Sequence, residues 1–350
     1  MDEFARRPAG DRRAFIEEAA SRRELTPVII EKDFWVCWTL RRLTTTPEIK
    51  DHVTFKGGTS LSKAYGIIQR FSEDIDLTIR RDAPLIDKVA PPMEPGISGK
   101  ERERRTKALK AAAQAYVETV AMPALTKAIE AALGTAEGWS VEHDPDDKDE
   151  QTLLFNYPRT SGWGNNWGSA WDGDPGTGYI KPRIKLEYGA RGEPEPFEAR
   201  AILPYLAEEF PDELPDSQTL VPTLSVLRTY WEKATLLHAL HHKGVLRDGL
   251  SRHYYDLVML DRAGVTADAL SHAELLAAVV RNKSLMFSDK AASYDTALIG
   301  QLRLFPTGMT EALASDYNAM ADMFMAAPPS LPDLLEAIDG LEKRLNGPAA

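Results

Sequence analysis

The chain has 350 residues, of which 43% are hydrophobic, so it can bury the core of one large or two modest domains. Its formal net charge of −11 argues against a protein that coats nucleic acid through bulk positive charge, although a local basic groove stays compatible with it. No run reaches the roughly 20 apolar residues of a membrane span, and the N-terminus has no apolar signal core, so we expect a cytoplasmic protein without a membrane partner.

The first third of the chain predicts two helices followed by a strand–turn–helix–strand unit. Apolar residues recur at helical spacing from residue 12 to about 43, and Pro27 begins the second helix. The single Cys37 lies in that helix and is expected to be a buried thiol without a catalytic role. A β-prone run at 53–56 ends at two glycines, and residues 74–79 alternate acidic and aliphatic side chains.

Strands give way to helices along the rest of the chain. A long alanine-rich helix is expected over 101–133, and strands over 151–157 and 179–189, with a Gly- and Trp-rich loop at 161–178 between the strands. Five helical patterns follow, at 223–242, 251–263, 267–286, 310–325 and 331–345. This order predicts an α+β fold with a catalytic half over 1–221 and a helical half over 222–350.

Two acidic residues of the alternating strand form the strongest candidate site. Residues two apart in a strand point to the same face, so Asp74 and Asp76 would present two carboxylates side by side. Such a pair repels itself unless a cation lies between its members, and Mg²⁺ prefers carboxylate and phosphate oxygens. An exposed edge strand is the alternative interpretation of the same pattern.

The preceding glycine turn adds a candidate phosphate site. Because Gly57 and Gly58 have no Cβ, their backbone N–H groups can approach a phosphate, and Thr59 and Ser60 add hydroxyl donors. A Gly-Gly pair alone is common in turns. Together with the acidic strand, however, the turn favours a site that binds a metal ion and a nucleotide phosphate.

A third carboxylate is offered by the predicted strand at 179–189. Lys185 and Glu187 share a face there, and an ion pair across strands would explain both without any site. With the acidic strand and the glycine turn present, Glu187 becomes the best further metal ligand or general base.

Four segments together resemble the motifs of the AbiEii/AbiGii nucleotidyltransferase toxin family. They are Lys56-Gly57-Gly58-Thr59 with Phe71 to Leu77, Lys185-Leu186-Glu187, Trp231-Glu232-Lys233, and Arg252 to Leu257. The resemblance implies a core like DNA polymerase β with a mixed sheet, plus a helical C-terminal domain that completes the active site. It also implies transfer of a nucleoside monophosphate from an NTP, in some members to the acceptor end of tRNA, which blocks aminoacylation. A cognate antitoxin is encoded nearby.

The same resemblance implies roles for particular residues. Asp74 and Asp76 hold Mg²⁺, Lys233 contacts the triphosphate, and Asp256 is an active-site carboxylate. Lys185 and Arg252 are candidates for binding the nucleotide. From spacing alone, Lys233 would be a surface residue, and Arg252 and Asp256, four apart on a helix, would form an ion pair.

The acceptor is the least determined part of this prediction. Candidate RNA contacts are Arg80, Arg81, Arg102, Arg104, Arg105 and Lys107, which could also be an ordinary solvated surface. Trp163, Trp167 and Trp171 could stack on an unpaired base or fold back onto the core. A protein side chain or a small hydroxylated molecule is the alternative acceptor, and a non-catalytic binding module is a third reading. The sequence leaves the oligomeric state open, a monomer included.

Overall fold

A computed structural model describes residues 1–72, 74–160, 181 and 183–347. Its strands are β1 (Val53–Lys56), β2 (Asp74–Ile79), β3 (Ser140–His143), β4 (Thr152–Asn156), β5 (Ile184–Gly189), β6 (Phe197–Ile202) and β7 (Thr219–Leu224). Within the described residues they form one seven-stranded sheet in the order β3-β4-β5-β2-β1-β7-β6. The sheet is mixed, because β2 pairs antiparallel with β1 and parallel with β5. The predicted α+β class is confirmed.

The strand register places the acidic residues at the centre of the sheet. Asp74 lies opposite Lys185 and Asp76 lies opposite Glu187 in the parallel β2–β5 pair. Ile75 and Leu77 point the other way and are at most 1% exposed. Alternation along β2 therefore buries the aliphatic side chains in the core and leaves the carboxylates on the opposite face.

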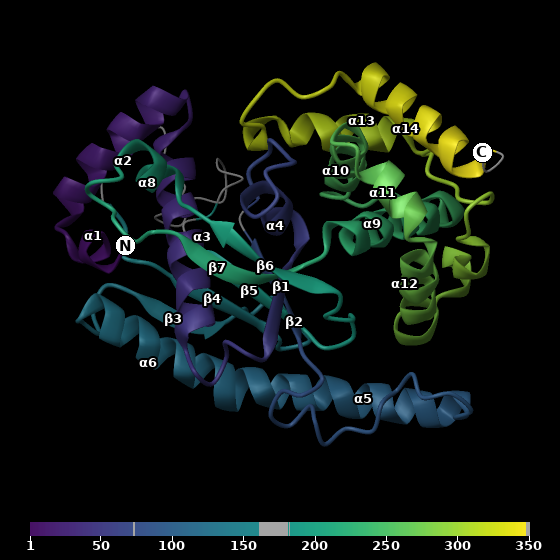
Figure 1. Cartoon of the computed structure of the whole chain (residues 1–350), viewed down its shortest axis with the longest axis horizontal. Coiled ribbons are helices and arrows are strands. Elements are labelled where there is room, and N and C mark those ends of the chain that lie inside the picture. The colour runs from purple at the N-terminus through teal and green to yellow at the C-terminus, as the bar shows by residue number, and fades with distance from the viewer. Residues whose placement is uncertain (73, 161–180, 182, 348–350) are drawn as a thin grey trace.

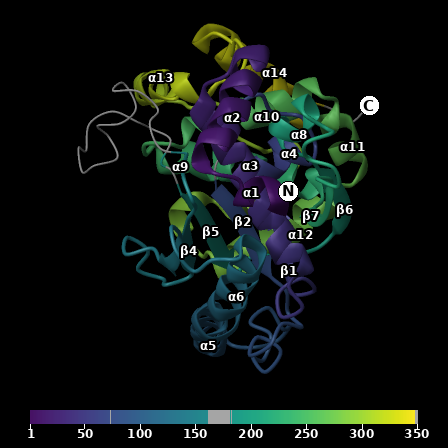
Figure 2. The same ribbon diagram turned by 90° about the vertical axis from the view of Figure 1, so that its left-hand side faces the viewer.

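Helices of the first half cover the sheet (Figures 1 and 2). They are α1 (Asp2–Arg6), α2 (Ala9–Arg23), α3 (Pro27–Thr45), α4 (Gly57–Lys63), α5 (Gly99–Tyr116), α6 (Met122–Leu133) and α8 (Tyr205–Glu209), with a π-helical segment at Val117–Ala121 joining α5 to α6. Trp35 and Trp38 of α3 are buried and stack on Tyr157 and Phe155 respectively. Cys37 is fully buried as expected, and burial raises the pKa of its thiol.

The second half of the chain is helical after β7. Its helices are α9 (Val226–Lys243), α10 (Ser251–Arg262), α11 (Val265–Ser271), α12 (Ala273–Met286), α13 (Thr310–Ala319) and α14 (Leu331–Asn346), with 3-10 turns at Lys290–Ala292, Tyr294–Thr296 and Ala321–Met323. These helices share a hydrophobic cluster that is separate from the cluster around the sheet. Across the described ranges, no helix is both long and apolar enough to cross a bilayer.

Several elements differ from those that the sequence pattern predicts. Strands β3, β6 and β7 were not expected, and β7 contains Pro222, which ordinarily argues against a strand inside a sheet. Pro222 is tolerated opposite Ala199 of β6. The helix expected over 267–286 is divided into α11 and α12 at His272, and the one expected over 310–325 ends at Ala319.

Candidate active site

A cavity of about 280 Å³, here called the first cavity, lies where β1, β2 and β5 meet α9, α10 and α12. Asp74, Asp76 and Glu187 line it from the sheet, and Gly57 and Gly58 line it from the start of α4. The residues that the sequence patterns single out on three separate segments therefore meet around one space.

Asp76 has a strongly perturbed carboxyl group. Burial, together with the nearby carboxylates of Glu187 and Asp74, raises its pKa to about 7, against the opposing effects of Lys56 and Arg252. A cation between Asp74 and Asp76 would relieve that repulsion. In the part of the chain that the structure describes, no three His, Cys, Asp or Glu side chains are arranged to hold a metal by themselves. Two neighbouring carboxylates fit a divalent cation whose remaining ligands are substrate phosphates and water.

Close contact explains why two glycines stand beside these carboxylates. Gly57 has φ +82°, and a Cβ there would lie 1.9 Å from Oδ2 of Asp76. A Cβ on Gly58 would lie 2.6 Å from both Nη2 of Arg70 and Oγ of Ser72. Any other residue at either position would displace side chains that line the cavity.

The hydroxyl groups after the glycines have a different place from the one expected. Thr59 and Ser60 are fully buried. Their hydroxyls donate to the backbone oxygens of Asp74 (2.5 Å) and Gly57 (2.8 Å), so they hold the turn against β2 and do not line the cavity. Ser72, which was not among the expected site residues, lines the cavity in their stead.

Cationic side chains form the wall opposite the carboxylates. Lys233 of α9 and Arg252 of α10 both line the first cavity, as the family resemblance implies. Lys283 of α12 joins them, although no motif in the sequence indicated it. Its Nζ donates to the backbone oxygen of Glu232 (2.7 Å), and burial lowers its pKa to about 8. Cations from three helices therefore line the same cavity as the carboxylates of β2 and β5.

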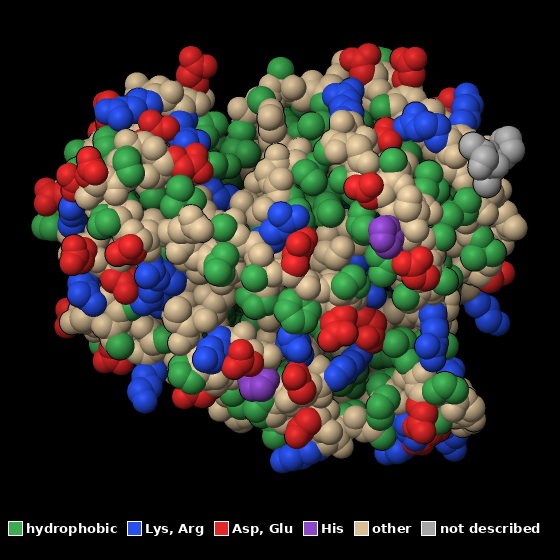
Figure 3. Space-filling model, viewed as in Figure 1, with side chains coloured by type: hydrophobic (Ala, Val, Ile, Leu, Met, Phe, Trp, Pro, Cys, Tyr) green, Lys and Arg blue, Asp and Glu red, His purple; other side chains and the backbone are tan. Residues whose placement is uncertain are grey.

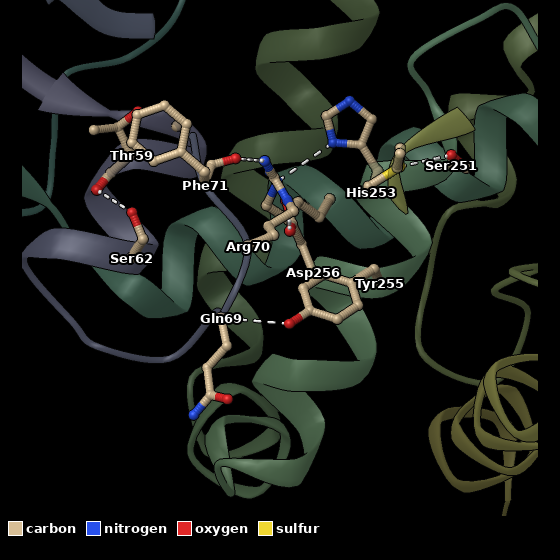
Figure 4. Close-up of polar contacts among 12 residues, drawn as sticks. Thr59, Ser62, Gln69, Arg70, Phe71, Ser251, His253, Tyr255 and Asp256 are labelled. Carbon is tan, nitrogen blue, oxygen red and sulfur yellow. Dashed lines mark hydrogen bonds and ion pairs between the residues drawn. The ribbon is translucent and has the colours of Figure 1, made fainter. Parts of the chain in front are cut away.

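Asp256 lies behind this wall and does not line the cavity. It is fully buried and accepts from Nε and Nη2 of Arg70 (2.7 and 2.8 Å) and from Nζ of Lys233 (2.7 Å) (Figure 4). Burial alone would raise its pKa, but Arg70 and Lys233 hold it below its usual value. Asp256 therefore pairs with these two cations and not with Arg252, and it positions groups that do line the cavity.

His253 completes the same network. Its Nδ1 lies 3.3 Å from Nζ of Lys233, and burial together with that cation lowers its pKa well below the ordinary histidine value. The ring is therefore neutral at pH 7. A neutral imidazole can accept a hydrogen bond from Lys233 without adding charge to the cavity.

A second cavity of about 430 Å³ adjoins the first. Glu187 lines both cavities, whereas Lys185 lines only the second. Nζ of Lys185 lies 2.7 Å from Oε1 of Glu187 and 3.7 Å from Oδ2 of Asp144. Lys185 and Glu187 therefore form an ion pair with each other along β5, beside the candidate site, where the sequence had suggested a pair across strands.

The candidate RNA contacts do not form a free basic surface. Arg104 and Arg105 pair with Glu101 of their own helix, and Lys107 pairs with Glu103. Near β2, Arg80 lies 3.5 Å from Asp82, Arg81 lies 3.3 Å from Glu193, and Arg102 is partly buried. Basic and acidic side chains are likewise interspersed on the face in Figure 3. Trp163, Trp167 and Trp171 lie outside the described residues.

Two comparisons with known proteins found a match. A family model described as nucleotidyl transferase AbiEii toxin, type IV toxin–antitoxin system, matches residues 38–340. MenT4, a nucleotidyltransferase toxin from Mycobacterium tuberculosis H37Rv, has a similar structure with a TM-score of 0.51 at 16% identity, covering 97% of this chain and 90% of that one. No curated protein matches the chain in sequence.

The fold and the family match together define a nucleotidyltransferase. The chain belongs to the AbiEii family of nucleotidyltransferase toxins of type IV toxin–antitoxin systems. Such a toxin has an NTP substrate and an antitoxin partner.

Proposed function

We propose that this toxin is an Mg²⁺-dependent enzyme that transfers a nucleoside monophosphate from an NTP to the acceptor end of tRNA in the cytoplasm and thereby blocks aminoacylation. The main support is that one cavity is lined by carboxylates of the sheet, the glycine turn and cations of three helices. These residues are Asp74, Asp76, Glu187, Gly57, Gly58, Lys233, Arg252 and Lys283. A cognate antitoxin encoded nearby restrains the activity.

Each part of the cavity has a role in this proposal. Asp74 and Asp76 hold Mg²⁺, which when bound neutralises phosphate charge. The backbone at Gly57 and Gly58 accommodates the phosphates, and Lys233, Arg252 and Lys283 offset the charge that develops on the departing pyrophosphate. Asp256 keeps Lys233 in place.

The transfer step balances without a further reactant. An acceptor hydroxyl oxygen forms a bond to the α-phosphorus while the bond from that phosphorus to the bridging oxygen of the β-phosphate breaks. Pyrophosphate leaves with the bridging oxygen, and Glu187 takes the hydroxyl proton. Glu187 is suited to this because it lines both cavities and is partly exposed.

Labelled NTPs, each incubated with purified toxin, total tRNA and Mg²⁺, provide the test. We expect label on tRNA, a loss on the order of 10²–10³-fold in Asp76→Asn, and dependence on Mg²⁺ that EDTA abolishes. Asp82→Asn, an exposed carboxylate just beyond β2, is the matched control and keeps full activity. Label that stays equal in Asp76→Asn would refute the metal assignment, and absence of label from tRNA would refute the acceptor.

A second candidate keeps the chemistry and changes the acceptor to a protein side chain or a small hydroxylated molecule. It is favoured by the acidic side of the second cavity, where a neutral or cationic acceptor would meet no repulsion from Asp144, Asp146, Asp147 and Asp149. The same labelling separates the two, because label would then appear on protein or in the low-molecular-weight fraction.

A further inference from the structure

The two cavities are related in a way that fits an in-line displacement. Gly58, Lys233 and Arg252, which surround the expected triphosphate, line only the first cavity. Asp76 and Glu187 line both. In phosphoryl transfer the attacking and leaving oxygens lie on opposite sides of the phosphorus. If pyrophosphate leaves on the side of the first cavity, the acceptor hydroxyl must arrive from the second.

The acidic loop of the second cavity is mostly engaged with its own surroundings. Asp147 accepts from the backbone N–H groups of Asp149 and Gln151 and from the Thr152 hydroxyl (2.7–2.9 Å). Asp149 pairs with Lys110 at 2.6 Å. These carboxylates shape the loop, so the groups available to an acceptor lie elsewhere in the cavity.

Phe287 is the unusual surface of this second cavity. It is 39% exposed, follows α12 directly, and lines both cavities. The Arg191 guanidinium lies 4.6 Å from the centre of its ring. An exposed aromatic ring and a guanidinium are the two side-chain groups on which an unpaired base stacks.

Neighbouring residues hold both Arg191 and Phe287 in place. Nδ2 of Asn282, a residue only 4% exposed, donates to the backbone oxygen of Arg191 at 3.0 Å. Met286, the last residue of α12, is buried in the cluster around the sheet. Phe287 and Arg191 thus form a preorganised platform beside the carboxylates, and we call it the Phe287–Arg191 platform.

We propose that the second cavity is the acceptor subsite and that the base of the acceptor's terminal nucleotide stacks on the Phe287–Arg191 platform. The inference rests on the proposed transfer to RNA. It places the terminal ribose hydroxyl next to Glu187 and Asp76, where the two cavities meet.

Steady-state kinetics of the purified toxin with total tRNA test the platform. Stacking contributes about 1–3 kcal/mol per base, so Phe287→Ala is expected to raise the KM for tRNA about 10-fold while the KM for the NTP changes less than about twofold. Phe287→Trp should keep the wild-type KM for tRNA. Leu298→Ala removes a similarly exposed apolar side chain (43%) outside both cavities and should change neither constant. A rise in the KM for the NTP instead would overturn the inference.

Equilibrium binding separates this inference from the proposed function. A short RNA that ends in 2-aminopurine loses fluorescence when the terminal base stacks, and we expect that loss with wild-type toxin and not with Phe287→Ala. If wild-type toxin labels tRNA but the variant quenches equally, the platform is wrong and the function stands. If tRNA is not labelled yet quenching depends on Phe287, the platform stands and the function is wrong. If the wild-type toxin shows no labelling of tRNA and no quenching, both the platform and the proposed function are wrong.

Discussion

Gly57 lies directly beside Asp76, a candidate metal-binding carboxylate. Its φ of +82° is one that other residues adopt with strain, and its missing Cβ leaves the space that Oδ2 of Asp76 occupies. Gly66, only nine residues later, also has a positive φ (+64°) but has no atom within 4 Å of its Cβ position among the described residues. A substitution at Gly66 therefore tests backbone strain alone, whereas a substitution at Gly57 tests strain together with a clash in the site.

Substitution at these two positions gives a matched prediction. Gly66→Ala should lower the free energy of unfolding by about 1 kcal/mol and leave nucleotidyl transfer unchanged. Gly57→Ala adds a clash with Asp76, and we expect transfer to fall at least about 100-fold because the Asp76 carboxylate must leave its present position in the cavity. Thermal melts and initial rates measure both effects. An active Gly57→Ala enzyme would show that the position of Asp76 is not critical.

At the scale of an element, helix α12 and the residue that follows it supply three residues of the candidate site. Asn282 holds the segment after β5, Lys283 lines the first cavity, and Phe287 lies at the junction of the two cavities. Other described residues of α12 pack on α9, so the helix joins the helical half to the sheet at the site. Helix α12 therefore both holds the helical half against the sheet and carries side chains that line the cavities.

The lowered pKa of Lys283 predicts a pH dependence of NTP binding. Because its pKa in the fold is about 8 and not 10.5, Lys283 is charged below pH 8 and loses its proton above it. Between pH 7 and 9 the charged fraction falls about 10-fold, so the KM for the NTP should rise towards that factor. Lys283→Arg keeps the charge and should remove the rise. A KM that rises equally in both enzymes would assign the titration to another group.

The two halves of the whole molecule meet through a short segment that precedes β2. Ile68 belongs to the hydrophobic cluster of the C-terminal helices, and the N–H of Phe71 donates to the oxygen of Met323 at 2.6 Å. Arg70 then reaches Asp256 of α10. The division at residue 221 stays a prediction, but chain segments clearly cross between the two clusters.

Asp256 should therefore matter for the stability of the whole molecule. Asp256→Asn removes the buried negative charge that Arg70 and Lys233 share, and we expect the free energy of unfolding to fall by about 3–5 kcal/mol. Asp339→Asn removes an exposed i,i+4 pair with Lys343 and should leave the free energy of unfolding nearly unchanged. Denaturant unfolding compares the two. Equal costs would mean that the buried network does not stabilise the joined halves.

Local patterns predicted the parts of the site whose geometry is set within a few residues. The period of two in β2 placed Asp74 and Asp76 on one face. The two glycines indicated that the backbone comes close to another group, which in the structure is the Asp76 carboxylate for Gly57. Local reasoning was weaker for Lys233 and Asp256. From spacing alone Lys233 would be a surface residue and Asp256 the partner of Arg252, and only the family resemblance indicated a role in the site. Local reasoning also misplaced two hydroxyls. The Ser60 hydroxyl bonds within its own turn, to Gly57, and the Thr59 hydroxyl bonds to the backbone of Asp74 on the neighbouring strand β2.

The sequence by itself determined the α+β class, the β2 carboxylates and the family of this nucleotidyltransferase toxin. Only the tertiary structure decided that Asp256 pairs with Arg70 and Lys233, and that Lys283 and Phe287 line the first cavity. It also decided that Arg104, Arg105 and Lys107 of α5 pair within their own helix. The physical reason for this division is the distance along the chain over which each kind of interaction acts. Periodicity and turn chemistry act between near neighbours, whereas these contacts join residues far apart in the chain and depend on how helices pack against the sheet.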